Sequence, residues 1–280
     1  MYIHFVGGLA GHKGRNLLPK ELIAIKLAKH HYPFARIKIW TDKASWHNAP
    51  NWCERHEVAE SWYSAWSNFA LKAGQHMSDK VRLFALKQFG GLYLDTDVLC
   101  LRPINLFGRQ KVLMAREGNR SSKKLNNGII YVPRPNHPFI DIWIQQYTEA
   151  KRLGYWEYLS VRKPFELAQQ YPELIEFEQY SYKQFHGVGW KGKTYYDENV
   201  SLPSYADKAY FWHCLDSSQI EITDINLLGK IFKYAMRCVS SAYFLLGFIF
   251  VSFVCTMSEK LNEIKFVLLC RLRCKMVMII

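Results

Sequence analysis

The sequence lacks the features that mark several common classes of protein. It contains no internal repeat, no low-complexity run and no segment that resembles a nucleic-acid-binding module, although its formal net charge is +13. Its seven cysteines show no pairing rhythm and their number is odd, so we expect reduced thiols facing a cytosol rather than a disulfide framework. The chain starts directly with a strand-like segment, and we expect no signal peptide there.

At 280 residues, the chain is long enough for one large α/β domain with a sizeable core and an additional tail. The composition changes near residue 224. Residues 224–280 carry eight basic and three acidic side chains among long apolar stretches. We therefore expect an α/β domain over residues 1–223 and an apolar, basic, helical tail over residues 224–280.

The segment 78–103 is the most informative part of the chain. Ser78 is a favourable N-cap for a helix whose apolar positions continue to Phe89. Gly90-Gly91 would end that helix where a left-handed C-cap residue is wanted. The short apolar strand Leu92–Leu94 follows, and it predicts that the next residues lie at the carboxyl edge of a sheet.

Two acids, Asp95 and Asp97, come directly after this strand. Ligands of α/β sheets collect at the carboxyl ends of strands, and two carboxylates spaced i, i+2 can converge on one hard cation. Such an ion could hold the phosphates of a nucleotide. An Asp-x-Asp pair taken alone is more often a solvated turn, so the neighbouring residues decide its meaning.

Strands and helices alternate through the first half of the chain. Residues 2–6 and 37–40 read as strands, and Pro19 opens a helix that continues to about His30. The first strand ends in Gly7-Gly8, where the backbone can approach a ligand closely. This alternation predicts a mainly parallel central sheet in an α/β domain.

The segment 78–103 resembles glycosyltransferase family 32, the DXD sugar-binding group. That group includes yeast Golgi mannosyltransferases, bacterial capsule and lipopolysaccharide sugar transferases, and clostridial toxin glucosyltransferase domains. The family pattern is S-D-x-x-R, then G-G-x-Y-x-D-x-D. This chain matches it at Ser78, Asp79, Arg82, Gly90, Gly91, Tyr93, Asp95 and Asp97. The resemblance implies a GT-A-like fold, a nucleotide-sugar donor and a Mn²⁺ or Mg²⁺ cofactor.

The resemblance also implies roles for particular residues. Asp97 would be the direct metal ligand, while Asp95 would hold sugar or ribose hydroxyls and assist the metal. Asp79 and Arg82 would contact the donor sugar or its phosphates; as an alternative, they form only an intrahelical ion pair. Arg82 would also assist catalysis as a fixed positive charge.

The first strand and its glycine turn would form the base pocket, which assigns Phe5 and Gly7 to donor binding. Related enzymes often have a Trp between this strand and the glycines, and this chain lacks it. Phe5 would stack on the base, although an aromatic residue in a first strand more often belongs to the core.

Two later segments complete the expected site. Asn126 and Asn127 would offer hydrogen bonds to the sugar, although Asn-Gly is also a common hairpin turn. His137 is expected to cap the next helix, at about residues 139–150. The aromatic strand at 209–213 ends in His213, which would complete the metal or phosphate site or else be structural.

The resemblance implies a glycosyltransferase that transfers a hexose with retention to a saccharide or lipid-linked acceptor in surface polysaccharide or glycan synthesis. Two alternatives remain open. One is a non-catalytic, membrane-bound homologue. The other is a haloacid-dehalogenase-like phosphatase, because Leu94-Asp-Thr-Asp-Val-Leu superficially matches the start of that motif.

The tail predicts contact with an anionic membrane surface. Val239–Met257 is 19 residues long and uncharged, long enough to span a bilayer, and basic residues lie on both sides of it. A span would place the basic end against the positive-inside tendency, whereas an interfacial helix would not. A buried core helix is the third alternative. We expect a membrane-associated protein whose catalytic domain faces the cytoplasm.

Overall fold

The computed structural model describes residues 1–9, 14–59, 74–117, 122–149, 157–178 and 210–213, all within the first of the two units of the chain, Met1–Ile222. The expected membrane segment, Val239–Met257, lies outside the described residues. Among the residues that are described, no helix is long and apolar enough to cross a membrane.

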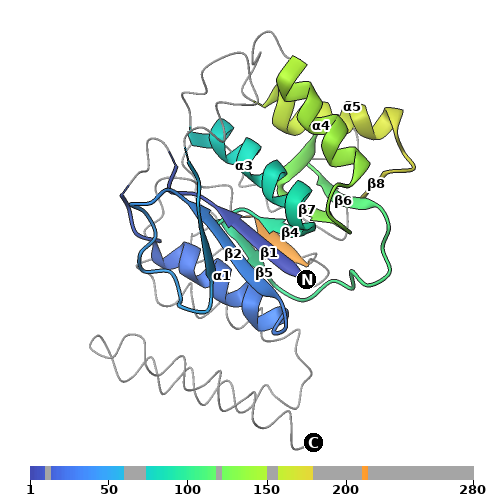
Figure 1. Cartoon of the computed structure of the whole chain (residues 1–280). Coiled ribbons are helices and arrows are strands. Elements are labelled where there is room, and N and C mark those ends of the chain that lie inside the picture. The colour runs from blue at the N-terminus through green and yellow to red at the C-terminus, as the bar shows by residue number, and fades with distance from the viewer. Residues whose placement is uncertain (10–13, 60–73, 118–121, 150–156, 179–209, 214–280) are drawn as a thin grey trace, which may run out of the picture. The chain divides into compact units, whose positions relative to one another are not determined.

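Strands and helices alternate along the described chain, as the sequence predicts (Figure 1). The elements are, in order, β1 (Tyr2–Val6), α1 (Pro19–His31), β2 (Arg36–Thr41), β3 (Glu54–Glu57), α3 (Gly74–Phe89), β4 (Gly91–Leu94), β5 (Val98–Cys100), β6 (Val112–Arg116), β7 (Leu125–Val132), α4 (Pro138–Glu149), the π-helix η2 (Tyr158–Arg162), α5 (Lys163–Gln170), β8 (Ile175–Glu178) and β9 (Phe211–His213).

Seven of the described strands form one mixed sheet in the order β3-β2-β1-β4-β7-β6-β8. Strands β1, β2, β3 and β4 run parallel to one another, β7 pairs antiparallel with β4 and β6, and β8 is parallel to β6. The carboxyl ends of β1, β2 and β4 therefore meet at one edge of the sheet. The α/β class and the mainly parallel sheet are confirmed.

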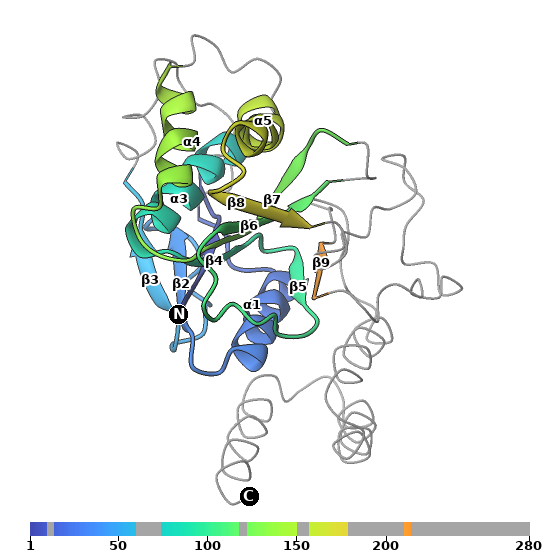
Figure 2. The same ribbon diagram turned by 90° about the vertical axis from the view of Figure 1, so that its right-hand side faces the viewer.

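Helices cover both faces of this sheet (Figure 2). Helix α3 packs against β1 and β4, and α4 and α5 lie on the same side as α3. Helix α1 lies on the other side, where it packs against β5. The core on the α3 side is rich in large apolar residues, among them Trp40, Phe139 and Trp143, all nearly inaccessible to water.

Local sequence signals set most element boundaries. Pro19 opens α1, as predicted. Helix α3 ends at Phe89, and Gly90 follows in the left-handed region with φ +61°, where a side chain would be strained. The prediction for Ser78 is wrong: α3 begins four residues earlier, at Gly74, so Ser78 lies inside the helix and is not its N-cap.

Candidate metal and nucleotide-sugar site

The acidic motif lies in a tight turn between β4 and β5. The Asp95 N–H donates to the carbonyl of Gly128 on β7, at 2.8 Å, and the Asp95 carbonyl accepts from Val98 N–H at 3.0 Å. The first bond extends the β4–β7 ladder by one residue, and the second closes the turn. Both aspartates are therefore held at the carboxyl edge of the sheet, as the sequence predicts.

A short strand from the far end of the domain brings a histidine to this turn. β9 pairs antiparallel with β5, and His213 lies opposite Val98, the residue next to Asp97. The pairing is extended by Leu101 and Arg102, whose N–H groups both donate to the Tyr210 carbonyl. The structure thus brings together residues that are more than a hundred positions apart in sequence.

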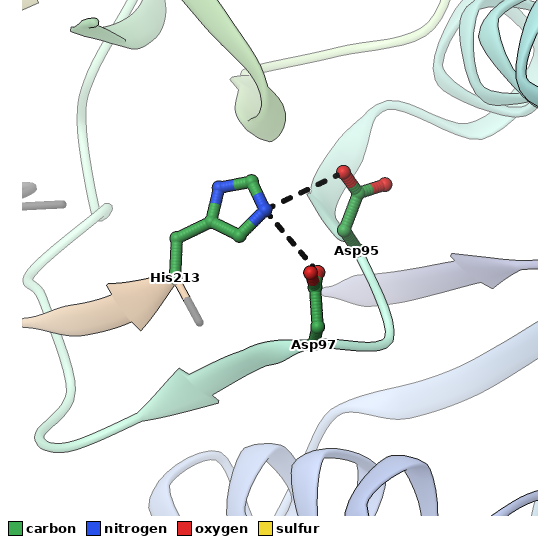
Figure 3. Close-up of side chains that lie close together, drawn as sticks. All are labelled: Asp95, Asp97 and His213. Carbon is green, nitrogen blue, oxygen red and sulfur yellow. Dashed lines mark ion pairs between the residues drawn. The ribbon is translucent and has the colours of Figure 1, made fainter. Parts of the chain in front are cut away.

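The three side chains form one compact cluster (Figure 3). His213 Nε2 is 3.2 Å from Asp97 Oδ1 and 4.0 Å from Asp95 Oδ2. One ligand atom from each residue lies within 4.8 Å of the other two. Burial opposes charge at both groups of the close pair, but their mutual attraction prevails: it lowers the pKa of Asp97 and raises the pKa of His213.

The space beside this cluster exists because residue 128 is a glycine. A Cβ at Gly128 would lie 2.6 Å from Asp95 Oδ2 and 2.7 Å from His213 Cε1. Both distances are shorter than any real Cβ contact. Gly128 lies inside β7 with an ordinary strand conformation, so the close approach of the ligand atoms, not backbone geometry, requires the glycine.

Asp95 is oriented by two partners that leave its other oxygen for the cluster. Its Oδ1 accepts from the Tyr93 hydroxyl at 2.5 Å and lies 3.3 Å from Arg82 Nη1. Its Oδ2 faces His213 and Gly128. The Arg82 guanidinium also lies over the Tyr93 ring, 4.6 Å from its centroid. Asp95 is therefore held in one orientation before any ligand binds.

Arg82 and Asp79 form a buried polar network behind the motif. Arg82 Nη2 is 3.3 Å from Asp79 Oδ1, and Arg82 Nη1 donates to the Asn127 carbonyl at 2.7 Å. The Asn127 side chain donates to Asp79 Oδ1 at 2.7 Å. Burial raises the pKa of Asp79 to about 6, although Arg82 favours its charged form. The predicted ion pair is present, and it belongs to a network that reaches Asp95.

The two asparagines serve the backbone and this network. Asn126 is buried, and its Oδ1 accepts from the N–H of Gly128 at 2.9 Å. Since β7 runs unbroken from Leu125 to Val132, the Asn-Gly pair is not a hairpin turn. His137 caps α4 through a bond from Phe139 N–H to His137 Nδ1, at 3.3 Å, which confirms the capping prediction.

The predicted base-pocket residues have structural neighbours instead of open space. The ring of Phe5 is fully buried in the core, which favours the core alternative over stacking on a base. A Cβ at Gly7 would lie 2.3 Å from Cζ2 of Trp46, so the close approach at Gly7 is made by an indole ring. Trp46 itself is fully buried, and it has a positive φ of 59°.

Sequence reasoning missed four residues that shape the site: Glu21, Tyr93, Thr96 and Gly128. Tyr93 was matched to the family pattern but was given no role. Gly128 carried a usable signal, because a glycine inside a strand often marks a close approach. Glu21 and Thr96 carried no such signal, because the hydrogen bond from the Thr96 hydroxyl to the Glu21 carboxylate joins residues 75 positions apart.

The donor atoms fit a divalent cation. Two carboxylate oxygens suit Mn²⁺ or Mg²⁺, and an imidazole nitrogen is a less common ligand for Mg²⁺, which keeps oxygen ligands. The Nδ1 atom of His213 is buried and has no hydrogen-bond partner among the residues that the structure describes. Asp95 Oδ2, Asp97 Oδ1 and His213 Nε2 are therefore the atoms that would hold the ion.

Comparison with known proteins identifies the same segment. Residues 20–114 match the family model described as "Glycosyltransferase sugar-binding region containing DXD motif". "Glucan organizing enzyme 1" from Cryptococcus neoformans is 33% identical over 143 residues, which are 49% of this chain and 37% of that protein. The human "Alpha-1,4-N-acetylglucosaminyltransferase" is 32% identical over 97 residues, 34% of this chain and 26% of that protein.

The matches thus span 37% and 26% of the length of these two relatives. Among solved structures, the galactosyltransferase LgtC in complex with donor and acceptor sugar analogues has a TM-score of 0.48 at 13% identity. That comparison covers 87% of this chain and 99% of that one. Residues 20–114 are thus similar to the DXD-containing sugar-binding region of glycosyltransferases, and the resemblance expected from the sequence is confirmed over that segment.

Proposed function

We propose that this chain is a metal-dependent, retaining glycosyltransferase that moves a hexose from a nucleotide-diphosphate sugar to a saccharide or lipid-linked acceptor. The observation that carries the proposal is the convergence of Asp95, Asp97 and His213 around one small space. Both aspartates lie in the segment that matches the DXD family. A solvated turn would not need the buried histidine or the glycine that leaves room beside it.

The protein would contribute position and charge to the reaction. A bound Mn²⁺ or Mg²⁺ would offset the negative charge that develops on the departing nucleotide diphosphate. Tyr93 and Arg82 fix the orientation of Asp95, so that the ligand atoms need not reorganise. Since we assign no covalent nucleophile, retention would require the acceptor hydroxyl to form its bond to the sugar on the same face from which the nucleotide diphosphate leaves.

The name of the human relative suggests which donor to test first. That protein is named for N-acetylglucosaminyl transfer. UDP-N-acetylglucosamine therefore comes first in a donor panel that also contains UDP-glucose, UDP-galactose and GDP-mannose. We infer a role in surface polysaccharide or glycan synthesis, which the name of the fungal relative supports.

The test is Mn²⁺-dependent hydrolysis of that donor panel by the purified full chain, with Asp97→Asn as the variant. We expect turnover of one donor, its loss in EDTA, and a fall of at least about a hundredfold in the variant, because a direct ligand matters more than an outer one. Release of phosphate from phosphomonoesters would indicate the phosphatase alternative instead. Absence of both activities and of metal-dependent nucleotide binding would indicate a non-catalytic homologue.

A further inference from the structure

The middle residue of the acidic motif is tied to a distant helix. Thr96 stands between the two aspartates, and its hydroxyl donates to Glu21 Oε1 at 3.2 Å. Glu21 lies in the first turn of α1. The side chain of Thr96 therefore holds the turn from the α1 side, while Asp95 and Asp97 meet His213 on the other.

The Glu21 carboxylate is itself fully paired. Arg15 binds it with two parallel hydrogen bonds, Nη1 to Oε2 and Nη2 to Oε1, each 2.7 Å long. Oε2 also accepts from the N–H of Leu18 at 2.8 Å, which caps the start of α1. The side chain is only 5% exposed. A bidentate pair has a defined geometry, and with Glu21 buried it presents Oε1 to Thr96 at a fixed position.

The partner of Glu21 is also held in place. The carbonyl of Arg15 accepts from Trp46 N–H at 2.8 Å, and the N–H of Gly14 donates to Ser45 Oγ at 2.8 Å. These bonds fasten the segment before α1 to the loop that follows β2. Since α1 also packs against β5, the strand after the motif, Glu21 rests on a framework that surrounds the turn.

We propose that Glu21 is a positioning residue for the cation site, acting through Thr96 to fix the turn that carries Asp95 and Asp97. The inference rests on the proposed function, because it assumes that these carboxylates hold a divalent ion. Bringing two carboxylates to one point costs free energy through their mutual repulsion. Because Thr96 already fixes the turn from the α1 side, a bound ion would not have to restrict the conformation of the turn itself.

The sharpest test changes only the hydroxyl of Thr96. Thr96→Val keeps the shape and leaves the Arg15–Glu21 pair intact, whereas Thr96→Ser keeps the hydroxyl. Binding of Mn²⁺ to the purified full chain is measured by the loss of the electron paramagnetic resonance signal of free Mn²⁺. We expect Thr96→Val to raise the Mn²⁺ Kd about tenfold or more, the usual effect of losing an outer partner of a metal ligand. Thr96→Ser should stay within about threefold of the wild type.

A double-mutant cycle with Glu21→Gln tests whether the effect passes through Thr96. If Glu21 acts through that hydroxyl, the two substitutions together should raise the Mn²⁺ Kd by less than the product of their separate effects. If the Mn²⁺ Kd of the double variant rises by the full product of the two separate effects, the proposal is overturned. Thr148→Val on α4 is the matched control, because it also removes one hydroxyl, one that donates to the Gln145 carbonyl at 2.8 Å, and it should bind Mn²⁺ as the wild type does.

The outcomes separate this inference from the function on which it rests. If Thr96→Val binds Mn²⁺ as tightly as the wild type while Asp97→Asn does not bind it, Glu21 is not a positioning residue and the metal site stands. If the wild type itself binds no Mn²⁺, both proposals fall. Thermal melts of each variant show that a loss of binding is not a loss of folding.

Discussion

At position 128, the site depends on the absence of a side chain. Replacing Gly128 by Ala would put a methyl group 2.6 Å from Asp95 Oδ2, and the strand could not move away without breaking the bond from Asp95 N–H to the carbonyl of residue 128. We expect Gly128→Ala to weaken Mn²⁺ binding and donor hydrolysis by about tenfold or more. Isothermal titration with Mn²⁺ and donor turnover check this. Full activity with an intact fold would show that the space is not used.

Individual residues differ in how far the sequence predicts them. Asp95 and Asp97 are set by local order, because a short strand must deliver the next residues to its own carboxyl end. The Ser78 prediction failed, since the helix begins at Gly74 and the Ser78 hydroxyl instead accepts from Arg82 Nη2, at 3.3 Å. The Glu21–Thr96 contact depends on how α1 packs, which no local pattern encodes.

Among the elements, β1 is joined to its neighbours by a buried histidine. His4 Nε2 donates to the carbonyl of Gly90, at 2.8 Å, and its Nδ1 accepts from Trp40 Nε1, at 3.2 Å. These bonds connect β1 to β2 and to the turn between α3 and β4. The bond from Trp40 requires a neutral imidazole, because a protonated Nδ1 could not accept it, whereas the bond to Gly90 can form in either state.

Burial lowers the pKa of His4 to about 4, although its bond to Gly90 favours the charged form; Lys38 and His56 lower the pKa further, and Glu54 opposes them. The unfolded chain, with a pKa near 6.5, binds the proton first. Stability is therefore lost as pH falls from about 6.5 to about 4, by roughly 3 kcal/mol for this group. His31, whose pKa burial also lowers to about 4, adds to the loss in the same range.

His4→Gln removes this proton-binding group. The free energy of unfolding of the variant, measured with urea, should therefore fall less steeply between pH 6.5 and pH 4 than that of the wild type. His47→Gln, which removes an exposed imidazole, is the matched control for the substitution itself. Equal slopes for His4→Gln and the wild type would mean that His4 is not neutral in the fold.

The boundaries of elements follow local chemistry more closely than the pairing between them does. The strand at residues 2–6, the α1 helix opened by Pro19 and the left-handed Gly90 were all predicted from neighbours in sequence. The Asn127-Gly128 pair could be read either as a turn or as a strand, and burial of β7 between β4 and β6 decided for the strand. The pairing of β9 with β5 joins distant segments, so the sequence pointed to His213 without locating its partner strand.

At the scale of the whole molecule, the last fifth of the sequence combines positive charge with long apolar stretches. Residues 224–280 carry a net charge of +5 and include the uncharged segment Val239–Met257. The family-matched segment, by contrast, ends at residue 114. We propose that the tail holds the protein at an anionic membrane surface with its catalytic domain facing the cytoplasm, which would bring the site to a lipid-linked acceptor.

This arrangement predicts how the full chain distributes between membrane and solution. We expect it to sediment with vesicles that contain phosphatidylglycerol, and to do so less as salt rises, since screening weakens attraction between basic side chains and anionic lipid. Leu245→Asp with Leu246→Asp should release the protein while donor hydrolysis continues, because charge opposes burial of this segment in lipid. Extraction of cell membranes at high pH then separates the alternatives: an interfacial helix is released and a spanning one is retained. Unchanged sedimentation of the double variant would contradict membrane attachment through this segment.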